Sequence, residues 1–310
     1  MRHELRLFLL ALQFLTRFPV PAWVGYEPAW LNHCVRHFPL VGLCVGGFGA
    51  LVLALALALF PPPVAVLLSM IATVWVTGAL HEDGLADTCD ALGGAVSRER
   101  ALEIMKDSRI GTYGACGLVL TLGLKAAVLT ELVLLHPVLA CVALAWGHAA
   151  SRVAPVWLMW ALPYGGDADH AKVKPLATQV GAADVVIATI WLALLCAVVW
   201  SGAVQLGEVA AVDGESGLNG LGGADGVAGL RGIADAIRGA GIAEGAAAMQ
   251  AAAIVMAGLC TWLAARWLRK RLGGYTGDTL GALQQVTEIA VLLAWLAVAS
   301  AAWAPLASPG

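Results

Sequence analysis

Four carboxylates lie close together in the stretch GALHEDGLADTCD at positions 78 to 90, namely Glu82, Asp83, Asp87 and Asp90. In a helix the three aspartates share one face over two turns, because they are spaced i, i+4 and i+7. Like charges at this spacing repel, and a bound divalent cation would offset the repulsion. Oxygen ligands favour Mg²⁺, or alternatively Mn²⁺, over zinc. The spacing therefore predicts a metal site at all four carboxylates, with His81 as a further candidate; the alternative is a solvated acidic loop.

Basic residues follow the acids in the stretch SRERALEIMKDSRIGTYGA, from position 97 to 115. Metal-bound carboxylates beside lysine and arginine are typical of phosphoryl transfer, in which cations balance the charge of the migrating group. We therefore predict catalytic roles for Lys106 and Arg109, beside Asp83, Asp87 and Asp90, and substrate binding for Arg98. The alternative is an ordinary basic loop.

Two cations, Lys125 and Arg152, fall inside apolar segments. Ionisable residues within a membrane are costly and indicate function. We predict that both bind a substrate phosphate. Lys125 could instead reach the membrane surface through its long side chain, and Arg152, with His148 one turn away, could instead pair with a carboxylate.

A glycine-rich stretch, RKRLGGYTGDTLGALQQVTE, covers positions 269 to 288. Glycines spaced by four residues also allow close packing of helices, which is the alternative explanation. Hydroxyls and one acid within flexible backbone suit a loop that binds phosphate or bridges a metal. The stretch therefore predicts a catalytic Asp278, in the same site as the first acids, and substrate binding by Thr276 and Gly277.

The whole chain has the composition of a membrane protein. Of its 310 residues, 60% are hydrophobic and 13% are charged, whereas a soluble domain has about 25% charged residues. The net charge of −3 gives no reason to expect a nucleic-acid partner. Seven cysteines lie singly, without the spacing of a zinc or redox site. The apolar N-terminus resembles a signal peptide, but Arg17 and Pro19 replace the small cleavage-site residues, and we predict a retained interfacial helix.

Seven segments are long and apolar enough to span a bilayer, which takes about 20 residues. The sequence thus predicts an all-α, polytopic membrane bundle that forms a single domain over residues 1–310. The predicted spans are 38–60, 64–80, 114–135, 137–162, 183–206, 246–268 and 286–304.

The positions of basic residues predict the orientation. Seven spans place the N-terminus and loops 81–113, 163–182 and 269–285 on one side. The other side carries only Arg231 and Arg238, in a Gly- and Ala-rich segment, 207–245, that we predict to be a flexible loop. The positive-inside rule makes the first side cytoplasmic. Its basic residues are Arg2, Arg6, Arg17, Arg36, Arg98, Arg100, Lys106, Arg109, Lys172, Lys174, Arg269, Lys270 and Arg271.

The stretches TGALHEDGLADTCDALGG, RERALEIMKDSRIGTYGACGLVL with Lys125, and GGYTGDTLGA resemble the cobalamin synthase family, also called adenosylcobinamide-GDP ribazoletransferases. The N-terminal FLTRFPVP and HFPLVG are similar to the opening of that family. The resemblance runs from about residue 8 to 290 and does not include the 207–245 loop. Glu82 and Ala91 depart from the family pattern, which has an apolar residue and a glycine there.

The resemblance implies a Mg²⁺-dependent transferase of the bacterial inner membrane, with its N-terminus and active site in the cytoplasm. In the implied reaction, the 5′-hydroxyl of α-ribazole or of its 5′-phosphate attacks the corrinoid-linked phosphate of adenosylcobinamide-GDP. GMP leaves, and adenosylcobalamin or its phosphate forms. The expected partners are these substrates and the bilayer; a homo-oligomer or a complex with other corrinoid enzymes stays open.

Two other functions are alternatives for a membrane protein with these residues. A CDP-alcohol phosphotransferase also holds Mg²⁺ on membrane-helix aspartates, but its pattern has Ala-Arg shortly after Asp-Gly, whereas here Asp87 follows Ala86. A secondary transporter would carry ionisable residues at the bilayer midplane and repeated halves. No internal repeat is visible, and the acids lie at one interface, so both alternatives are less favoured.

Overall fold

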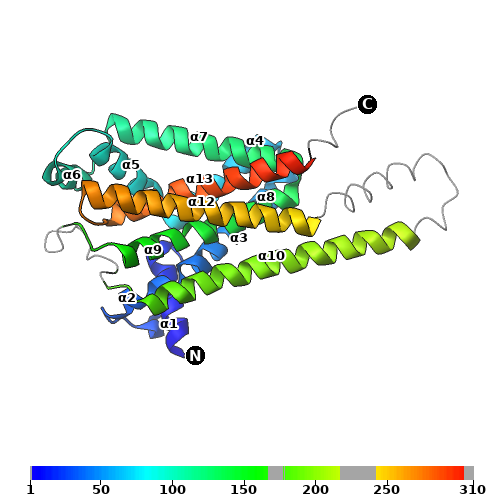
Figure 1. Cartoon of the computed structure of the whole chain (residues 1–310), viewed down its shortest axis with the longest axis horizontal. Helices are drawn as coiled ribbons and strands as arrows, with labels where there is room; N and C mark the ends of the chain where they lie inside the picture. The colour runs from blue at the N-terminus through cyan, green and yellow to red at the C-terminus, as the bar shows by residue number, and fades with distance from the viewer. Residues whose placement is uncertain (1, 167–176, 178, 217–241, 304–310) are drawn as a thin grey trace.

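The protein is a bundle of long helices in this computed structural model, which describes residues 2–166, 177, 179–216 and 242–303 (Figure 1). Within these ranges the only β-type pairing is an isolated bridge between Tyr164 and Tyr275. The predicted all-α class is therefore confirmed. The long helices are α3 (Phe38–Leu57), α7 (Thr112–Leu135), α8 (Pro137–Ser151), α9 (Val153–Ala161), α10 (Ala182–Ser216), α12 (Ile242–Arg271) and α13 (Gly277–Trp303).

The described residues contain six helical segments long and apolar enough to cross a membrane, and a seventh if a bent pair of helices counts as one span. The chain is thus a multi-pass membrane protein, in line with the seven predicted spans. Helix α13 is the most enclosed of these segments, and it packs against α5, α7, α8, α9 and α12. Residues that reach the middle of the bundle therefore come mainly from α13 and its neighbours.

The acidic stretch does not continue the preceding membrane helix. Helix α4 (Pro62–Thr77) ends at Gly78, α5 (Leu80–Leu92) starts after Ala79, and the two helices meet at 87°. Gly78 and Ala79 both have left-handed backbone angles, with φ of 66° and 58°. Such angles terminate a right-handed helix and turn the chain. The sequence prediction of one span through residue 80 is wrong here, because it gave no weight to this turn.

Helix α8 and helix α9 form one span with a break at Arg152. Pro155 accounts for the break, because proline cannot donate to the carbonyl four residues earlier. The break lies in the interior, where Arg152 is only 1% exposed. The span therefore delivers a cation to the centre of the bundle.

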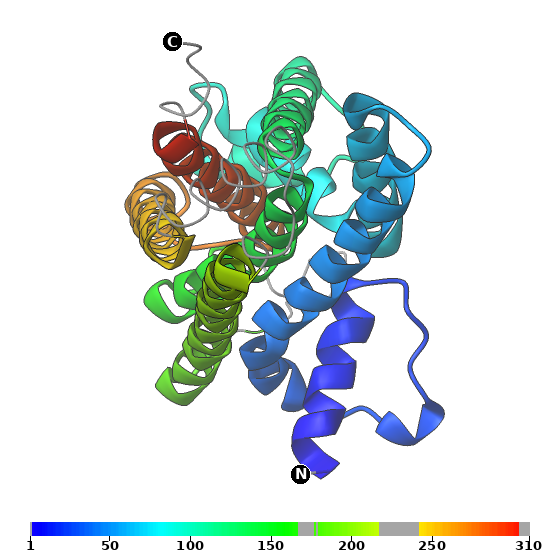
Figure 2. The same cartoon turned by 90° about the vertical axis from the view of Figure 1, so that its right-hand side faces the viewer.

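The N-terminal helix α1 (Arg2–Leu15) runs across the direction of the long helices, as the view along the bundle shows (Figure 2). A predicted N-terminal helix is therefore present. The chain then passes through η1 (Ala22–Val24), α2 (Trp30–Cys34) and η2 (Val35–His37) into α3.

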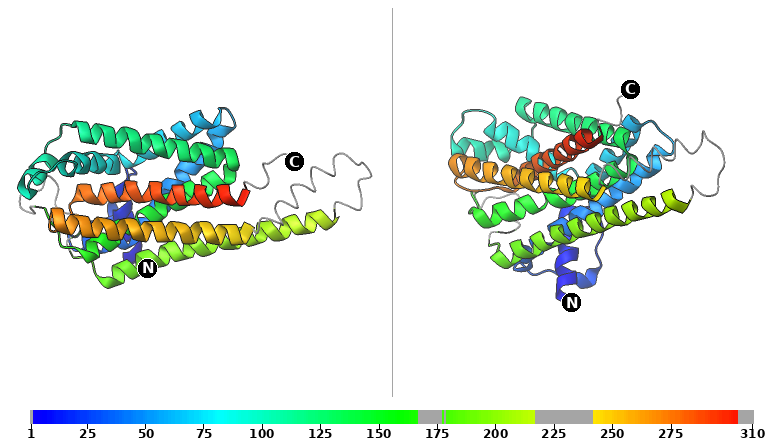
Figure 3. Two further views of the ribbon diagram at one scale, coloured as in Figure 1. Left: turned by 45° about the horizontal axis from the view of Figure 1, so that its top comes forward. Right: turned by 45° about the vertical axis from the view of Figure 1, so that its right-hand side comes forward.

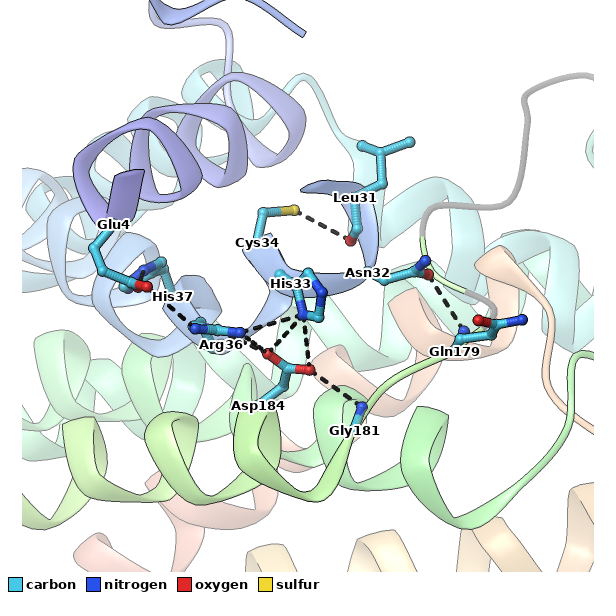
Figure 4. Close-up of polar contacts among 10 residues, drawn as sticks. All are labelled: Glu4, Leu31, Asn32, His33, Cys34, Arg36, His37, Gln179, Gly181 and Asp184. Atoms are coloured by element: carbon cyan, nitrogen blue, oxygen red, sulfur yellow. Dashed lines mark hydrogen bonds and ion pairs between the residues drawn. The ribbon is translucent and has the colours of Figure 1, made fainter. Parts of the chain in front are cut away.

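A cluster of ion pairs fixes α1 to α10 (Figure 4). The buried Asp184 carboxylate accepts from Nε of Arg36 at 2.7 Å and from the backbone N–H of Gly181 at 3.1 Å. Nη1 of Arg36 also reaches Oε1 of Glu4, at 3.2 Å, and Nε2 of His37 lies 3.0 Å from the other Glu4 oxygen. The position of α1 is therefore set by side chains from three parts of the chain.

Helices α10 and α12 lie side by side along one flank of the bundle (Figure 3). The predicted 207–245 loop is shorter than expected, because α10 continues to Ser216 and α12 begins at Ile242. Residues 217–241 of that loop, with Arg231 and Arg238, lie outside the described residues, as do Lys172 and Lys174. The short helix α6 (Arg98–Met105) and the turn between α12 and α13 lie at the end of the bundle that also holds α5 (Figure 1).

Candidate active site

A cavity of about 460 Å³ lies where α5, α6 and the start of α13 meet. Its wall is formed by residues from most of the predicted chemical stretches, although these are far apart in the sequence. The predicted site residues that line it are Asp83, Asp87, Lys106, Arg152, Thr276, Gly277 and Asp278.

Three carboxylates face this cavity from two helices. Asp83 and Asp87 are one turn apart on α5, and Asp278 is in the first turn of α13. The helices can approach because Gly84 lies against Asp278: a Cβ on Gly84 would be 2.7 Å from the Asp278 carbonyl oxygen. Gly281 also packs on α5, where its Cβ would be 3.3 Å from the Cα and the carbonyl oxygen of His81. The glycines thus bring the first and third acidic stretches into one site.

The other two predicted metal ligands lie outside the cavity wall. Asp90 accepts hydrogen bonds from the backbone N–H groups of Gly111 and Gly114, at 2.7 and 2.8 Å. These are orphan donors at the start of α7, so Asp90 caps that helix from α5. Glu82 points into the interior and accepts from Nε2 of Gln285 at 3.0 Å. The expected grouping of four carboxylates therefore splits into a cavity pair, a helix cap and a buried acceptor.

The basic residues that the sequence predicts for the site also lie partly in the cavity wall and partly outside it. Lys106 and Arg152 line the cavity. Arg98 instead donates to the backbone carbonyls of Leu272 and Gly165, at 2.7 and 2.8 Å, and so ties α6 to two turns at this end of the bundle. Arg109 is exposed and forms a bidentate pair with Asp107. Neither Arg98 nor Arg109 is placed to contact a molecule inside the cavity.

The start of α13 is fixed by two threonines. The backbone N–H of Thr276 donates to Oγ1 of Thr279 at 2.9 Å, and the N–H of Thr279 donates to Oγ1 of Thr276 at 3.3 Å. This reciprocal capping stabilises the first turn. Gly277 and Asp278 lie between the two threonines, and no atom lies within 4 Å of the position of a Cβ on Gly277. Thr276 is therefore engaged in the cap, whereas the backbone at Gly277 is open.

Lys125 lies away from the cavity, in a buried polar network. Its ammonium group pairs with the carboxylate of Glu288 on α13, and both side chains are less than 5% exposed. Glu288 also lies 3.3 Å from Nδ1 of His148 and accepts from Nε2 of Gln284 at 2.6 Å. The structure thus places Lys125 in a buried ion pair outside the cavity wall. Its contact with substrate phosphate stays a prediction.

The network extends to the cavity through Arg152. Nη1 of Arg152 donates to the His148 carbonyl at 2.9 Å, and Nη2 lies 3.2 Å from Nε2 of His81. Arg152, His81 and Gln284 all line the cavity. A guanidinium only donates, so Nε2 of His81 is the acceptor and the ring proton is on Nδ1. The network therefore holds the guanidinium in one orientation beside the cavity.

Tyrosines form another part of the wall. The rings of Tyr164 and Tyr275 meet edge to face, with centroids 5.7 Å apart, and Tyr275 donates its hydroxyl to the Ala177 carbonyl. Burial, reinforced by the Tyr164 hydroxyl, raises the pKa of Tyr275 to about 12, so this phenol stays protonated as a donor. Sequence reasoning missed these tyrosines, together with Gln284, Gln285 and Glu288. The sequence does contain a pattern that points to the last three, because polar residues at i and i+4 within an apolar helix indicate a buried network.

The cavity acids suit magnesium bound partly by substrate. Within the described ranges, no group of three or more His, Cys, Asp or Glu side chains is arranged to hold a metal ion by itself. Mg²⁺ is usually held by one or two carboxylates together with substrate phosphates and water. Asp83, Asp87 and Asp278 around one cavity supply the oxygen donors for this mode of binding.

The chain matches a family model described as cobalamin-5-phosphate synthase over residues 7–296. A Leptothrix cholodnii protein named adenosylcobinamide-GDP ribazoletransferase is 52% identical over 295 residues, which is 95% of this chain and 96% of the relative. Proteins of the same name from Polaromonas naphthalenivorans and Shewanella piezotolerans are 40% and 37% identical, over 93% and 97% of this chain and 96% and 98% of their own lengths. No solved structure matches the chain.

Proposed function

This chain belongs to the cobalamin-5-phosphate synthase family, and we propose that its cavity performs the family's transfer reaction with Mg²⁺ held at the aspartates. The enzyme is a cobalamin synthase: it transfers the corrinoid-linked phosphate of adenosylcobinamide-GDP to a ribose hydroxyl of α-ribazole or its 5′-phosphate. The 5′-phosphate has no free 5′-hydroxyl, so the 5′-hydroxyl expected from the resemblance cannot be the attacking group of that substrate. The oxygen–phosphorus bond to the acceptor forms, the bond to GMP breaks, and the hydroxyl proton is released. Family membership sets aside the CDP-alcohol phosphotransferase and transporter alternatives.

One observation carries the assignment of the site: carboxylates from α5 and α13 line the same cavity as Lys106 and Arg152. Attack on a diphosphate increases negative charge on the transferred and leaving phosphates, and fixed cations stabilise this charge. We assign this role to Lys106 and Arg152. Bound Mg²⁺ would supply further charge neutralisation and orientation at Asp83 and Asp87, with Asp278 opposite.

The acceptor hydroxyl must lose its proton as it attacks. His81 is not available as the base, because its Nε2 already accepts from Arg152 and its Nδ1 carries the ring proton. Among the other side chains that line the cavity, the aspartate carboxylates are the groups suited to take up a proton. We therefore assign proton acceptance to a cavity aspartate, which is within the range of groups used as general bases.

The same proposal includes the orientation. The cavity lies at the end of the bundle that carries Arg98, Arg100, Lys106, Arg109, Arg269, Lys270 and Arg271. An excess of basic residues marks the cytoplasmic side of a membrane protein. We propose that the cavity opens to the cytoplasm of a bacterial inner membrane, where both large polar substrates are present.

The direct test uses purified enzyme in lipid vesicles with adenosylcobinamide-GDP and α-ribazole. We expect GMP and the cobalamin product to form in equal amounts, to stop after treatment with EDTA, and to resume when Mg²⁺ is restored. Continued turnover in EDTA would remove the metal from the proposal, and no GMP release under any metal condition would contradict the assigned reaction.

A further inference from the structure

Part of the cavity wall is apolar and comes from the ends of helices α1, α3 and α5. Phe14 and Leu15 come from the end of α1, Phe38 from the start of α3, and Leu80 from the start of α5. The rings of Phe14 and Phe38 are nearly parallel, at 6°, with centroids 6.5 Å apart. Phe14 is 37% exposed, so it retains surface on which another aromatic ring can stack.

The polarity of the wall changes along α5. Leu80, Asp83 and Asp87 line the cavity and are spaced i, i+3 and i+7, so they follow one face of the helix. From the first to the last of them the helix rises about 10 Å. The cavity therefore changes from apolar to acidic over a distance comparable to the length of a nucleoside.

One of the cavity cations, Lys106, lies beside the acidic start of α13. Oγ1 of Thr276 contacts Sδ of Met105 at 3.6 Å, which places the end of α6, with Lys106, beside the start of α13. Gly277 and Asp278 follow Thr276 in that same turn. This side of the cavity suits phosphates, and the phenylalanine side does not.

The volume of the cavity suits one of the two substrates and not the other. At about 460 Å³ the cavity is in the lower part of the range, about 300–1,000 Å³, that encloses one drug-sized ligand. A nucleoside such as α-ribazole fits within such a volume. Adenosylcobinamide-GDP, with its corrin ring, adenosyl group and nucleotide, is several times larger, so most of it must stay outside.

We propose that Phe14, Leu15, Phe38 and Leu80 bind the aromatic base of the ribazole acceptor, which places its ribose hydroxyls at the aspartates while the corrinoid of the donor stays outside the cavity. The proposal rests on the function proposed above and deepens it by assigning the acceptor site. The base of α-ribazole is bicyclic, aromatic and uncharged, which matches an apolar surface with an exposed ring. The ion pairs that join Glu4, Arg36 and Asp184 hold α1 in place, so this surface is preformed (Figure 4).

The test compares Phe14→Ala with Phe18→Ala in purified enzyme. Phe18 is a matched control, because it forms a T-shaped pair with Phe48, with centroids 6.4 Å apart, and does not line the cavity. We expect Phe14→Ala to raise the KM for α-ribazole roughly tenfold or more, the size of one base–aromatic stacking contact. The KM for adenosylcobinamide-GDP and kcat at saturating α-ribazole should stay within about twofold, and Phe14→Trp should restore the acceptor KM.

A binding measurement keeps the test independent of catalysis. Calorimetric titration of α-ribazole into wild-type protein should show binding that Phe14→Ala and Leu80→Ala weaken and Phe18→Ala leaves unchanged. An unchanged acceptor KM and unchanged binding in active Phe14→Ala and Leu80→Ala enzyme would overturn the proposal while leaving the proposed function intact; the surface would then face lipid. A change confined to the KM for adenosylcobinamide-GDP would assign the surface to the corrinoid substrate, which would also overturn the proposal. If wild type released no GMP, the proposed function itself would fail.

Discussion

Successive acidic residues of α5 meet different neighbours, because each turn of a helix distributes side chains around its axis. Asp83 and Asp87 face the cavity, Glu82 faces the interior, and Asp90 faces the start of α7. The sequence predicts that the stretch carries chemistry and that Asp278 lies with it, and the structure places Asp278 on the wall of the same cavity as Asp83 and Asp87. The sequence could not separate Asp90 from its neighbours, since the backbone donors that engage Asp90 come from a loop whose path depends on tertiary packing.

Asp90→Asn should act on stability rather than on catalysis. The Asp90 carboxylate accepts from two backbone N–H groups of α7, and loss of a capping interaction costs about 1 kcal/mol. We expect a lower thermal midpoint in detergent, with GMP release by the folded protein within about threefold of wild type, whereas loss of a general base costs about 10²–10⁴-fold. If folded Asp90→Asn enzyme were inactive and needed more Mg²⁺, Asp90 would be a metal ligand, as the spacing alone predicts.

The buried pair of Lys125 and Glu288 predicts non-additive mutations. Removing one partner of a buried ion pair leaves an uncompensated charge and costs about 3–5 kcal/mol. Lys125→Met and Glu288→Gln should therefore each lower the thermal midpoint strongly, and the double variant should lose much less than the sum of the two. Simple additivity in the unfolding measurements would show that the two charges do not compensate each other in the membrane.

At the scale of elements, the site depends on the crossing of α5 and α13. The glycine-rich stretch at 269–288 made a packing motif as reasonable as a phosphate loop from sequence. The structure shows packing at Gly281, which lies against α5, while Gly277 lies open at the cavity, where binding of phosphate stays a prediction. The sequence predicted the long spans well, because apolar length determines them. It missed the 87° turn at Gly78 and Ala79, since one glycine after an apolar run does not reveal the left-handed angle that Ala79 also adopts.

Gly84→Ala should separate the cavity acids. Its Cβ would lie 2.7 Å from the Asp278 carbonyl oxygen, which is too close, so one helix must shift. A displacement of about 1 Å in a catalytic constellation costs about 100-fold in rate. Gly123→Ala in α7 is the control, because no atom lies within 4 Å of its added Cβ. Equal GMP release by the two variants would contradict the idea that this contact positions the site.

At the scale of the whole molecule, the bundle has two unlike ends. The cavity, α6 and the basic end of α12 share one end, and the turns between α3 and α4 and between α7 and α8 lie at the other (Figure 1). Charge counting from sequence predicted this division without knowledge of the packing, because each span reverses the direction of the chain. Charge counting does not predict which helices pack against each other, because that depends on side-chain contacts such as those of Glu288.

Cysteine labelling tests the proposed orientation. In a cysteine-free background, Leu59→Cys should react with an impermeant maleimide added to spheroplasts, because Leu59 is 78% exposed in the turn before α4. Arg100→Cys, in the exposed part of α6, should react only after the membrane is opened. Labelling in the reverse order would place the cavity outside the cytoplasm and exclude the proposed access route for both substrates.

The most direct test of the account measures GMP release against Mg²⁺ concentration in Asp83→Asn, Asp87→Asn and Asp278→Asn enzyme, with Glu103→Gln as control. Glu103 is an exposed carboxylate of α6 that pairs with Arg100 and lies outside the cavity wall. We predict that each cavity variant loses about 100-fold or more in kcat/KM, consistent with loss of a metal ligand or a general base. The variants of metal-holding aspartates should also need more Mg²⁺ for half-maximal activity, while Glu103→Gln matches wild type. Wild-type rates and an unchanged Mg²⁺ requirement in folded Asp83→Asn and Asp87→Asn enzyme would contradict the claim that this cavity is the active site.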